Sequence, residues 1–336
     1  MCDSQSLPGL LIRPLLLNIA SMRFEVTTLG TGAALPARGR FPSAQLLNIH
    51  ERLHLVDCGE GTQERLRQAE VNFNRIGTIF ISHMHGDHYL GLMGLLSSMH
   101  LNGRLDDLNV YGPPELREVI EVQLRASQTY LRYPLKVHGL EHATGAVVYS
   151  DPYVDVITLK LKHRIPTTGF LFREKQMPRR LRKERLVDIP HFARAAVKNG
   201  EDLTLVDGTV VPNHELTLDP PTPRRYAYCS DTAYAPALVE HLSGVDLLYH
   251  EATFTDAMSD RARETCHSTA KQAAMIAKAA NVGTLLLGHF SSRYKDNRVL
   301  LDEALPFFAN TLLAEEGRTF HIAQRAVVDN SDAEVT

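Results

Sequence analysis

A short segment, Ser82–His88, contains the densest group of possible metal ligands in this sequence. It follows the continuous apolar run Ile76–Ile81, which is typical of a strand buried on both faces. The side chains able to bind a metal are those of His83, His85, Asp87 and His88. Imidazole and carboxylate groups suit zinc, whereas a single histidine is more often an ordinary core or surface residue. The pattern therefore predicts a metal site at the end of a strand.

The spacing of these ligands indicates how they would share the site. His83 and His85 lie two residues apart in an extended segment, so both side chains would point to the same side. Asp87 and His88 would begin the helix that follows and could face a second metal. Gly86 has no Cβ, which lets the backbone fold tightly between the two pairs.

Three further candidate ligands stand at the ends of other apolar runs. They are His163 after the run 156–161, Asp231 after 227–229, and His289 after 284–287. Each is a weak candidate when taken alone. Because all three come just past a short strand pattern, as the first segment does, they can meet that segment at one edge of a sheet.

The segments that must position these ligands alternate between strand and helix patterns in both halves of the chain. In the first half we predict strands over 24–29, 52–56 and 76–81, and helices over 62–71 and 89–99. In the second half we predict strands over 227–229, 247–249 and 284–287, and helices over 235–242 and 268–280. Two similar halves predict an α/β fold, a four-layer αβ/βα sandwich of two mixed sheets with the helices outside.

The segment between the halves, 173–225, is rich in charge and proline and shows little apolar periodicity. Its first part, 173–185, contains seven Arg and Lys residues against two Glu. We interpret 173–225 as a substrate-binding arm inserted into a single domain that spans 22–330. The alternative is a mobile, solvated loop.

Composition and charge are those of an ordinary globular protein. The 336 residues are 44% hydrophobic and 22% charged, with a net charge of −3, so a nucleic acid would have to bind through local positive charge. The cysteines are scattered and form no CxxC pair, which favours a reducing, cytoplasmic environment; they are Cys2, Cys58, Cys229 and Cys266. We expect Cys58 and Cys229 to be small buried residues rather than ligands.

The first 21 residues precede the first strand pattern. Their apolar run, 10–20, is too short to span a bilayer and is interrupted by Arg13 and Pro14. Only Asp3 is charged before that run, which argues against a signal peptide. We predict that residues 1–21 are a leader that is optional or disordered, and we expect no membrane-spanning segment.

Several segments around the candidate ligands resemble the ribonuclease Z family of the metallo-β-lactamase superfamily. They are Leu29–Gly32, Leu55–Gln63 (LVDCGEGTQ), Gly91–Leu96, His163-Arg164, Gly169-Phe170, His250–Phe254 and His267–Thr269. The likeness extends from about residue 22 to about residue 325, nearly the whole chain.

The resemblance implies two zinc ions per chain. One would be held by His83, His85 and His163, the other by Asp87, His88 and His289, with Asp231 between them. Such a pair of ions activates a water molecule for attack on phosphorus. Asp87 would also accept the proton of that water. His267, oriented by Glu251, would contact the scissile phosphate or protonate the leaving oxygen.

The resemblance also implies a substrate. Proteins of this family are endoribonucleases that cut the 3′ trailer from precursor tRNA, usually as homodimers in which the arm grips the tRNA. The cations that we expect to contact tRNA are Arg179, Arg180, Arg182 and Lys183 in the arm and Arg293 near the metals. The stretch Asp188–Arg194 lacks the Gly-Pro pair found at the family's arm tip, so the grip on tRNA would differ here.

Two other functions fit parts of the sequence. A hydrolase of the metallo-β-lactamase fold acting on a small phosphodiester, ester or lactone would need the same ligands but no basic path for RNA. An RNA-binding protein with an inactive zinc site would have no need of the complete ligand set, and the seven candidate ligands therefore argue against it.

Overall fold

The computed structural model describes residues 23–324. The predicted leader, 1–21, lies outside the described residues. Within residues 23–324, no helix combines the length and the apolar character needed to cross a membrane.

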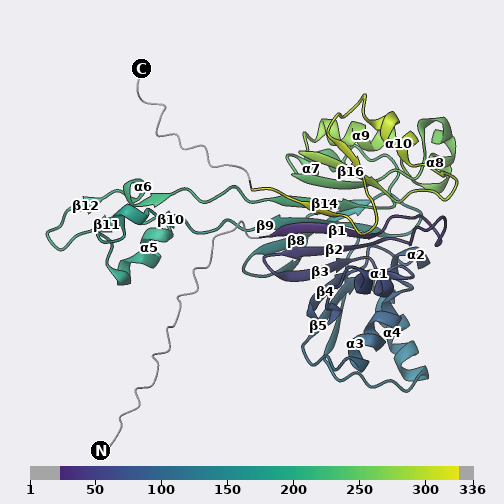
Figure 1. Ribbon diagram of the computed structural model, residues 1–336, viewed down its shortest axis with the longest axis horizontal. Helices are drawn as coiled ribbons and strands as arrows, with labels where there is room; N and C mark the ends of the chain where they lie inside the picture. Colours follow the sequence, from purple (N-terminus) through teal and green to yellow (C-terminus); the bar gives the residue numbers. More distant parts are fainter. Residues whose placement is uncertain (1–22, 325–336) are drawn as a thin grey trace, which may run out of the picture.

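Two sheets of seven strands each form the middle of the molecule (Figure 1). The first sheet has the order β18-β1-β2-β3-β4-β5-β6 and the second has the order β17-β16-β15-β14-β9-β8-β7. Both are mixed: β3 to β6 are parallel neighbours while β1 and β2 are antiparallel, and β14 to β17 are parallel while β7, β8 and β9 are antiparallel.

The strands of the first sheet are β1 (Phe24–Gly30), β2 (Ala44–Ile49), β3 (Arg52–Val56), β4 (Ile76–Phe80), β5 (Leu108–Gly112), β6 (Leu135–Gly139) and β18 (Thr319–His321). Those of the second are β7 (Val147–Ser150), β8 (Val154–Leu161), β9 (Thr167–Glu174), β14 (Arg225–Cys229), β15 (Leu247–Glu251), β16 (Thr284–Gly288) and β17 (Thr311–Leu313).

Helices cover the outer face of each sheet (Figure 1). Beside the first sheet lie α1 (Thr62–Gln68), α2 (Gly86–Tyr89), α3 (Leu92–Leu101) and α4 (Glu115–Ala126). Beside the second lie α7 (Leu238–Leu242), α8 (Ser259–Thr265), α9 (Ala270–Ala279) and α10 (Arg298–Ala304). The predicted four-layer sandwich of two mixed sheets is therefore confirmed.

Two apolar clusters hold these layers together. The larger one fills the space between the sheets, where the fully buried rings of Phe80, Phe172 and Tyr226 lie, and continues to the helices that cover the second sheet. The smaller one lies between the first sheet and its helices, where Leu95 and Ile120 pack. Central strands such as β4 bury both faces, which explains their continuous apolar sequences.

Local chemistry decides where several predicted helices begin and end. The helix expected over 89–99 is divided, because the N–H of Gly91 donates to the carbonyl of Cys58 and leaves no room for a Cβ. The helix expected over 62–71 ends at Gln68, before Glu70, which has a positive φ of 55°. The helix expected over 268–280 begins after Thr269, whose side chain forms a capping box with Gln272.

The inserted segment between β9 and β14 is folded and projects from the sandwich (Figure 1). Its regular elements are β10 (Arg180–Leu181), α5 (Arg194–Lys198), β11 (Leu203–Thr204), β12 (Val210–Val211), α6 (Asn213–Leu216) and β13 (Thr217–Leu218). A small apolar cluster of Ile189, Val197, Leu203 and Leu216 holds them together. A substrate-binding role for this arm stays a prediction.

Candidate active site

The predicted metal ligands stand just past the ends of four strands. The segment 82–88 follows β4, His163 follows β8, Asp231 follows β14 and His289 follows β16. Asp231 and His289 have positive φ values of 54° and 56°, so the backbone turns sharply at both positions.

The structure brings all seven predicted ligands together in two groups. The donor atoms of each group lie within 4.8 Å of one another: His83, His85, His163 and Asp231 in the first, and Asp87, His88 and His289 in the second. The groups match the division that the family resemblance implies.

The carboxylate of Asp231 lies between the two groups. Its Oδ2 is 3.6 Å from Nε2 of His83 and 3.7 Å from Nε2 of His163. Its Oδ1 is 3.2 Å from Nε2 of His88 and 3.0 Å from Nε2 of His289. One oxygen therefore faces each group, as a bridging ligand would require.

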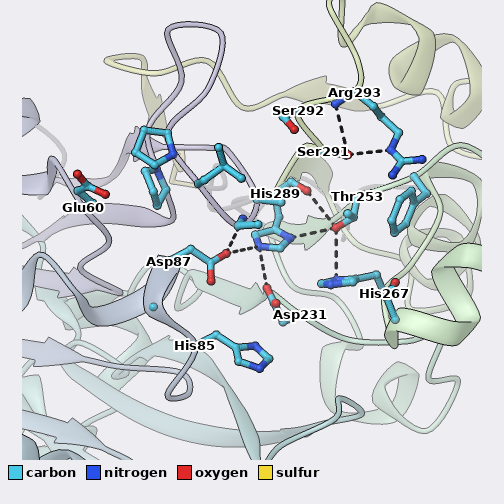
Figure 2. Close-up of a pocket in the computed structure, with 18 of the residues that line it drawn as sticks. Glu60, His85, Asp87, Asp231, Thr253, His267, His289, Ser291, Ser292 and Arg293 are labelled. Atoms are coloured by element: carbon cyan, nitrogen blue, oxygen red, sulfur yellow. Dashed lines mark hydrogen bonds and ion pairs between the residues drawn. The ribbon is translucent and has the colours of Figure 1, made fainter.

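The histidine nitrogens of the second group have the environment of metal ligands. Nε2 of His88 and Nε2 of His289 are buried and have no hydrogen-bond partner within the described part of the chain. A buried polar atom without a partner is unfavourable unless another ligand satisfies it. Both nitrogens face the carboxylates of Asp231 and Asp87, as Figure 2 shows for His289, so the donor set fits divalent cations.

Charge in the second group is also arranged for a cation. Burial alone would lower the pKa of His88, but Asp231, Asp57 and Asp87 outweigh it and raise that pKa well above its usual value. In the first group, burial and the neighbouring His88 lower the pKa of His83. The carboxylates thus concentrate negative potential on the side of His88, where a metal ion would neutralise it.

Hydrogen bonds from outside the groups fix the direction of the rings. His88 Nδ1 donates to Asp57 Oδ2 at 2.6 Å, and His163 Nδ1 donates to the carbonyl of Cys266 at 2.9 Å. His289 Nδ1 lies 3.0 Å from Thr253 Oγ1. With Nδ1 engaged, each ring presents Nε2 toward the centre.

A backbone group positions Asp87. The N–H of Ala34 donates to Asp87 Oδ2 at 2.7 Å, and Ala34 itself has a positive φ of 68°. The same Oδ2 lies 3.4 Å from Nε2 of His289. The loop between β1 and β2 is therefore part of the site, a role that the sequence analysis did not assign to it.

His267 forms the expected pair with Glu251. Its Nδ1 lies 2.8 Å from Oε1 of Glu251, which is fully buried and also accepts hydrogen bonds from the N–H groups of Thr232 and Ser268. Burial disfavours the charged ring, but the Glu251 carboxylate outweighs it and raises the pKa of His267 to about 9. The Glu251 carboxylate thus favours the protonated form of His267 beside the predicted metal ligands.

The ligands open into a hollow of about 440 Å³ (Figure 2). Asp87, Asp231, His267 and His289 point into it. Its cations are Arg164, Arg261 and Arg293, of which sequence reasoning named only Arg293 as a site residue. Arg164 follows a predicted ligand and could have been noticed. Arg261, on α8, carries no sequence signal.

The predicted cations of the arm lie outside this hollow. Arg179 is partly buried, and its side chain donates to Thr217 Oγ1 at 2.7 Å and pairs with Asp219 at 2.5 Å. Arg182 is also partly buried, whereas Arg180 and Lys183 are exposed. Only the last two present their charge freely to a partner.

The two cysteines within the family-like segments are not among the grouped donors. Cys58 and Cys229 are fully buried, and burial raises the pKa of each thiol to about 12. Both therefore remain neutral thiols in the core, with no part in the site.

Comparison with solved structures identifies the class of fold. A metallo-β-lactamase fold protein from Bacillus subtilis superposes with a TM-score of 0.62 at 19% identity, covering 89% of this chain and 98% of that one. Human tRNase Z, short form, superposes with a TM-score of 0.65 at 29% identity, covering 89% of this chain and 99% of that one. The fold and the donor groups define a metallo-β-lactamase-like protein.

Comparison with known sequences identifies the family. Ribonuclease Z of Phocaeicola vulgatus is 46% identical over 296 residues, which cover 88% of this chain and 96% of that protein. Residues 24–164 also match the family model described as anti-Pycsar protein Apyc1. The chain belongs to the ribonuclease Z family, as its motifs predicted.

Proposed function

We propose that this protein is a zinc-dependent endoribonuclease that cuts the 3′ trailer from precursor tRNA. The observation that carries the proposal is the placement of Asp231 between two groups of metal ligands, beside a hollow with three arginines. Its membership of the ribonuclease Z family supplies the substrate class.

Two zinc ions are the cofactors in this proposal. His83, His85 and His163 would hold one, and Asp87, His88 and His289 would hold the other, with Asp231 shared between them. When bound, the ions supply Lewis-acid chemistry, which activates water as a nucleophile and stabilises the charge that develops on a phosphodiester.

Asp87 accepts the proton of the attacking water. Its carboxylate borders the hollow, and one of its oxygens is held by the N–H of Ala34. Burial alone would raise the pKa of Asp87, but His88 and His289 outweigh it and lower that pKa, so the group is an ionised carboxylate that can also ligate a metal ion.

His267 protonates the leaving oxygen. Glu251 orients the ring through Nδ1, which leaves Nε2 to face the substrate. Arg164, Arg261 and Arg293 line the same hollow and neutralise the phosphates on either side of the cut. The guanidinium of Arg293 is held against the ring of Phe254, 5.1 Å from its centroid.

Distant parts of tRNA bind to the arm. Arg180 and Lys183 are the exposed members of the basic run 179–183, and the arm that carries them projects from the sandwich (Figure 1). In this proposal the protein acts as a homodimer in the cytoplasm, and one subunit's arm holds tRNA for its partner.

Incubation with a 3′-extended precursor tRNA tests the proposal. We expect a single cut near the 3′ end of the tRNA body, lost when zinc is removed by a chelator and restored by added zinc. Hydrolysis of bis-p-nitrophenyl phosphate without any cut in precursor tRNA would instead favour a small-diester hydrolase. Binding of the tRNA without hydrolysis of either substrate would favour an RNA-binding protein.

A further inference from the structure

A second hollow of about 750 Å³ adjoins the hollow that contains the metal ligands. The two hollows meet at three pairs of consecutive residues. Met84, Tyr89 and Ile165 line the second hollow, and their chain neighbours His85, Leu90 and Arg164 line the hollow that contains the metal ligands. Because consecutive Cα atoms are about 3.8 Å apart, the wall between the hollows is about one residue thick.

The lining of the second hollow differs chemically from that of the first. It is mainly apolar, with Met84, Leu140 and Ile165 beside three prolines, and it includes the rings of Tyr89 and His142. No Lys or Arg is among its lining residues. Its charged members are Glu115 and Glu141, both exposed, which would repel a phosphate.

The walls of this hollow are held in place from both sides. The N–H of Thr168 donates to the carbonyl of Ser82 at 3.0 Å, which joins the segment after His163 to the segment before His83. Nε2 of His142 donates to the carbonyl of Leu161 at 3.2 Å. One side of the hollow is thus formed by the segments around His83 and His163, which carry predicted metal ligands.

We propose that the second hollow binds the nucleobase next to the scissile phosphodiester. The inference rests on the proposed function, since an RNA whose phosphate lies at the metal ligands must continue across the thin wall on one side. Apolar and aromatic walls suit a base that has left its stack. The carboxylates of Glu115 and Glu141 accept hydrogen bonds from an exocyclic amino group, so adenine, cytosine and guanine fit better than uracil.

Removal of single bases from the substrate tests the proposal on the unaltered protein. Precursor tRNAs are made with one abasic nucleotide at each of the positions flanking the cut, and kcat/KM is measured for each. We expect one flanking position to stand out, with a loss of about tenfold or more, because stacking of a base on protein side chains has this magnitude. Uracil at that position should be cut more slowly than cytosine.

A variant that fills the hollow locates the effect. Gly139 ends β6 and lines the hollow, and a Cβ there would make only ordinary contacts with Pro114. Gly139→Leu should lower kcat/KM on the intact precursor. On the sensitive abasic precursor, which has no base to bind in the hollow, the variant and the unaltered protein should have the same kcat/KM. Gly77→Leu, on β4 with open space around its Cβ, is the matched control and should retain the sensitivity to base removal.

The outcomes separate this proposal from the proposed function. If precursor tRNA is cut but no abasic position stands out, or if Gly139→Leu and base removal act independently, the nucleobase site is wrong and the endoribonuclease stands. A second copy of the chain would occupy the hollow instead if no abasic position lowers kcat/KM and the Gly139→Leu variant dissociates into monomers in sedimentation analysis. If the unaltered protein cuts no precursor tRNA at all, the proposed function has failed.

Discussion

Asp57 and His88 form a fully buried pair in which His88 Nδ1 donates to Asp57 Oδ2 at 2.6 Å. The same carboxylate accepts hydrogen bonds from the N–H of Ser82 at 2.8 Å and from the hydroxyl of Tyr228 at 2.7 Å. Asp57, which directly follows β3, thus fixes both the proposed ligand His88 in α2 and Ser82 just past the end of β4. The ring of His88 cannot rotate away from the centre while this bond is kept.

Replacement of Asp57 should therefore weaken metal binding. Asp57→Asn keeps the size of the side chain but removes its charge, and loss of such an outer partner typically costs about 10–100-fold in metal affinity. Zinc occupancy at buffered free zinc, measured by elemental analysis, checks this. Asp107→Asn, an exposed carboxylate paired with Lys136, is the control and should bind zinc normally. Equal occupancy in both variants would contradict the role given to Asp57.

Replacement of Asp87 should abolish turnover while tRNA binding is largely kept. Asp87→Ala removes both a metal ligand and the proposed proton acceptor, and loss of general-base participation alone costs about 10²–10⁴-fold. Single-turnover cleavage and a filter-binding assay with the same precursor tRNA measure the two effects separately. Cleavage within tenfold of the unaltered protein would refute the assignment.

The exposed cations of the basic run 179–183 should contribute to tRNA binding. We expect Arg180→Ala combined with Lys183→Ala to weaken binding and to reduce the slope of log K against log salt by up to about 0.7–0.9 per lost phosphate contact. Arg179 is left unchanged because its bonds to Thr217 and Asp219 support the arm itself.

Hydrolysis of a small diester separates a grip on tRNA from a structural role of the arm. Bis-p-nitrophenyl phosphate should be hydrolysed normally by the arm variant, since that substrate does not extend to the arm. Arg125→Ala combined with Lys278→Ala removes two exposed cations from helices of the sandwich and serves as the control. If the control weakens tRNA binding as much as the arm variant does, the arm has no special role.

Glu174 should make stability depend on acid pH. Burial alone would raise its pKa, but hydrogen bonds from His50 and Arg224 outweigh it and lower that pKa from 4.5 to about 2. A carboxylate with a depressed pKa stabilises the fold above its unfolded pKa and loses this effect as pH falls through its folded pKa. The contribution should be roughly 2–3 kcal/mol at neutral pH and should disappear between pH 4.5 and about pH 2.

Urea unfolding at several pH values checks this contribution. Glu174→Gln should be less stable than the unaltered protein at pH 7, and the difference should shrink as pH falls below 4.5. Glu51→Gln, which removes an exposed partner of Arg23, should change little at either pH. A difference that stays constant from pH 7 to pH 3 would show that the charge of Glu174 is not the cause.

The sequence was most informative where side chains do chemistry directly. The ligands of segment 82–88 stand out because several chemically capable residues are close together, and His163, Asp231 and His289 share their position after a strand. Because each of them follows a strand, the sequence predicted that they could meet at one edge of a sheet. The two sheets could be anticipated because the central strands, such as β4 and β16, are continuously apolar.

Features that depend on backbone atoms or on distant packing could not be predicted. The N–H of Ala34 positions Asp87, yet every residue except proline has an N–H, so the identity of Ala34 does not reveal this contact. Arg261 reaches the hollow only because α8 packs beside it. The arm's core is too small to produce a periodic pattern, so the sequence predicted the insertion but not its short strands and helices.

The metal content of the protein tests the central claim most directly. If Asp231 joins two sites, elemental analysis of active protein prepared without chelators should find about two metal ions per chain. His289→Ala should mainly empty one site, whereas Asp231→Ala should lower the occupancy of both, because its two oxygens face different groups. One ion or none in fully active protein, or an Asp231→Ala variant that retains both, would contradict the account.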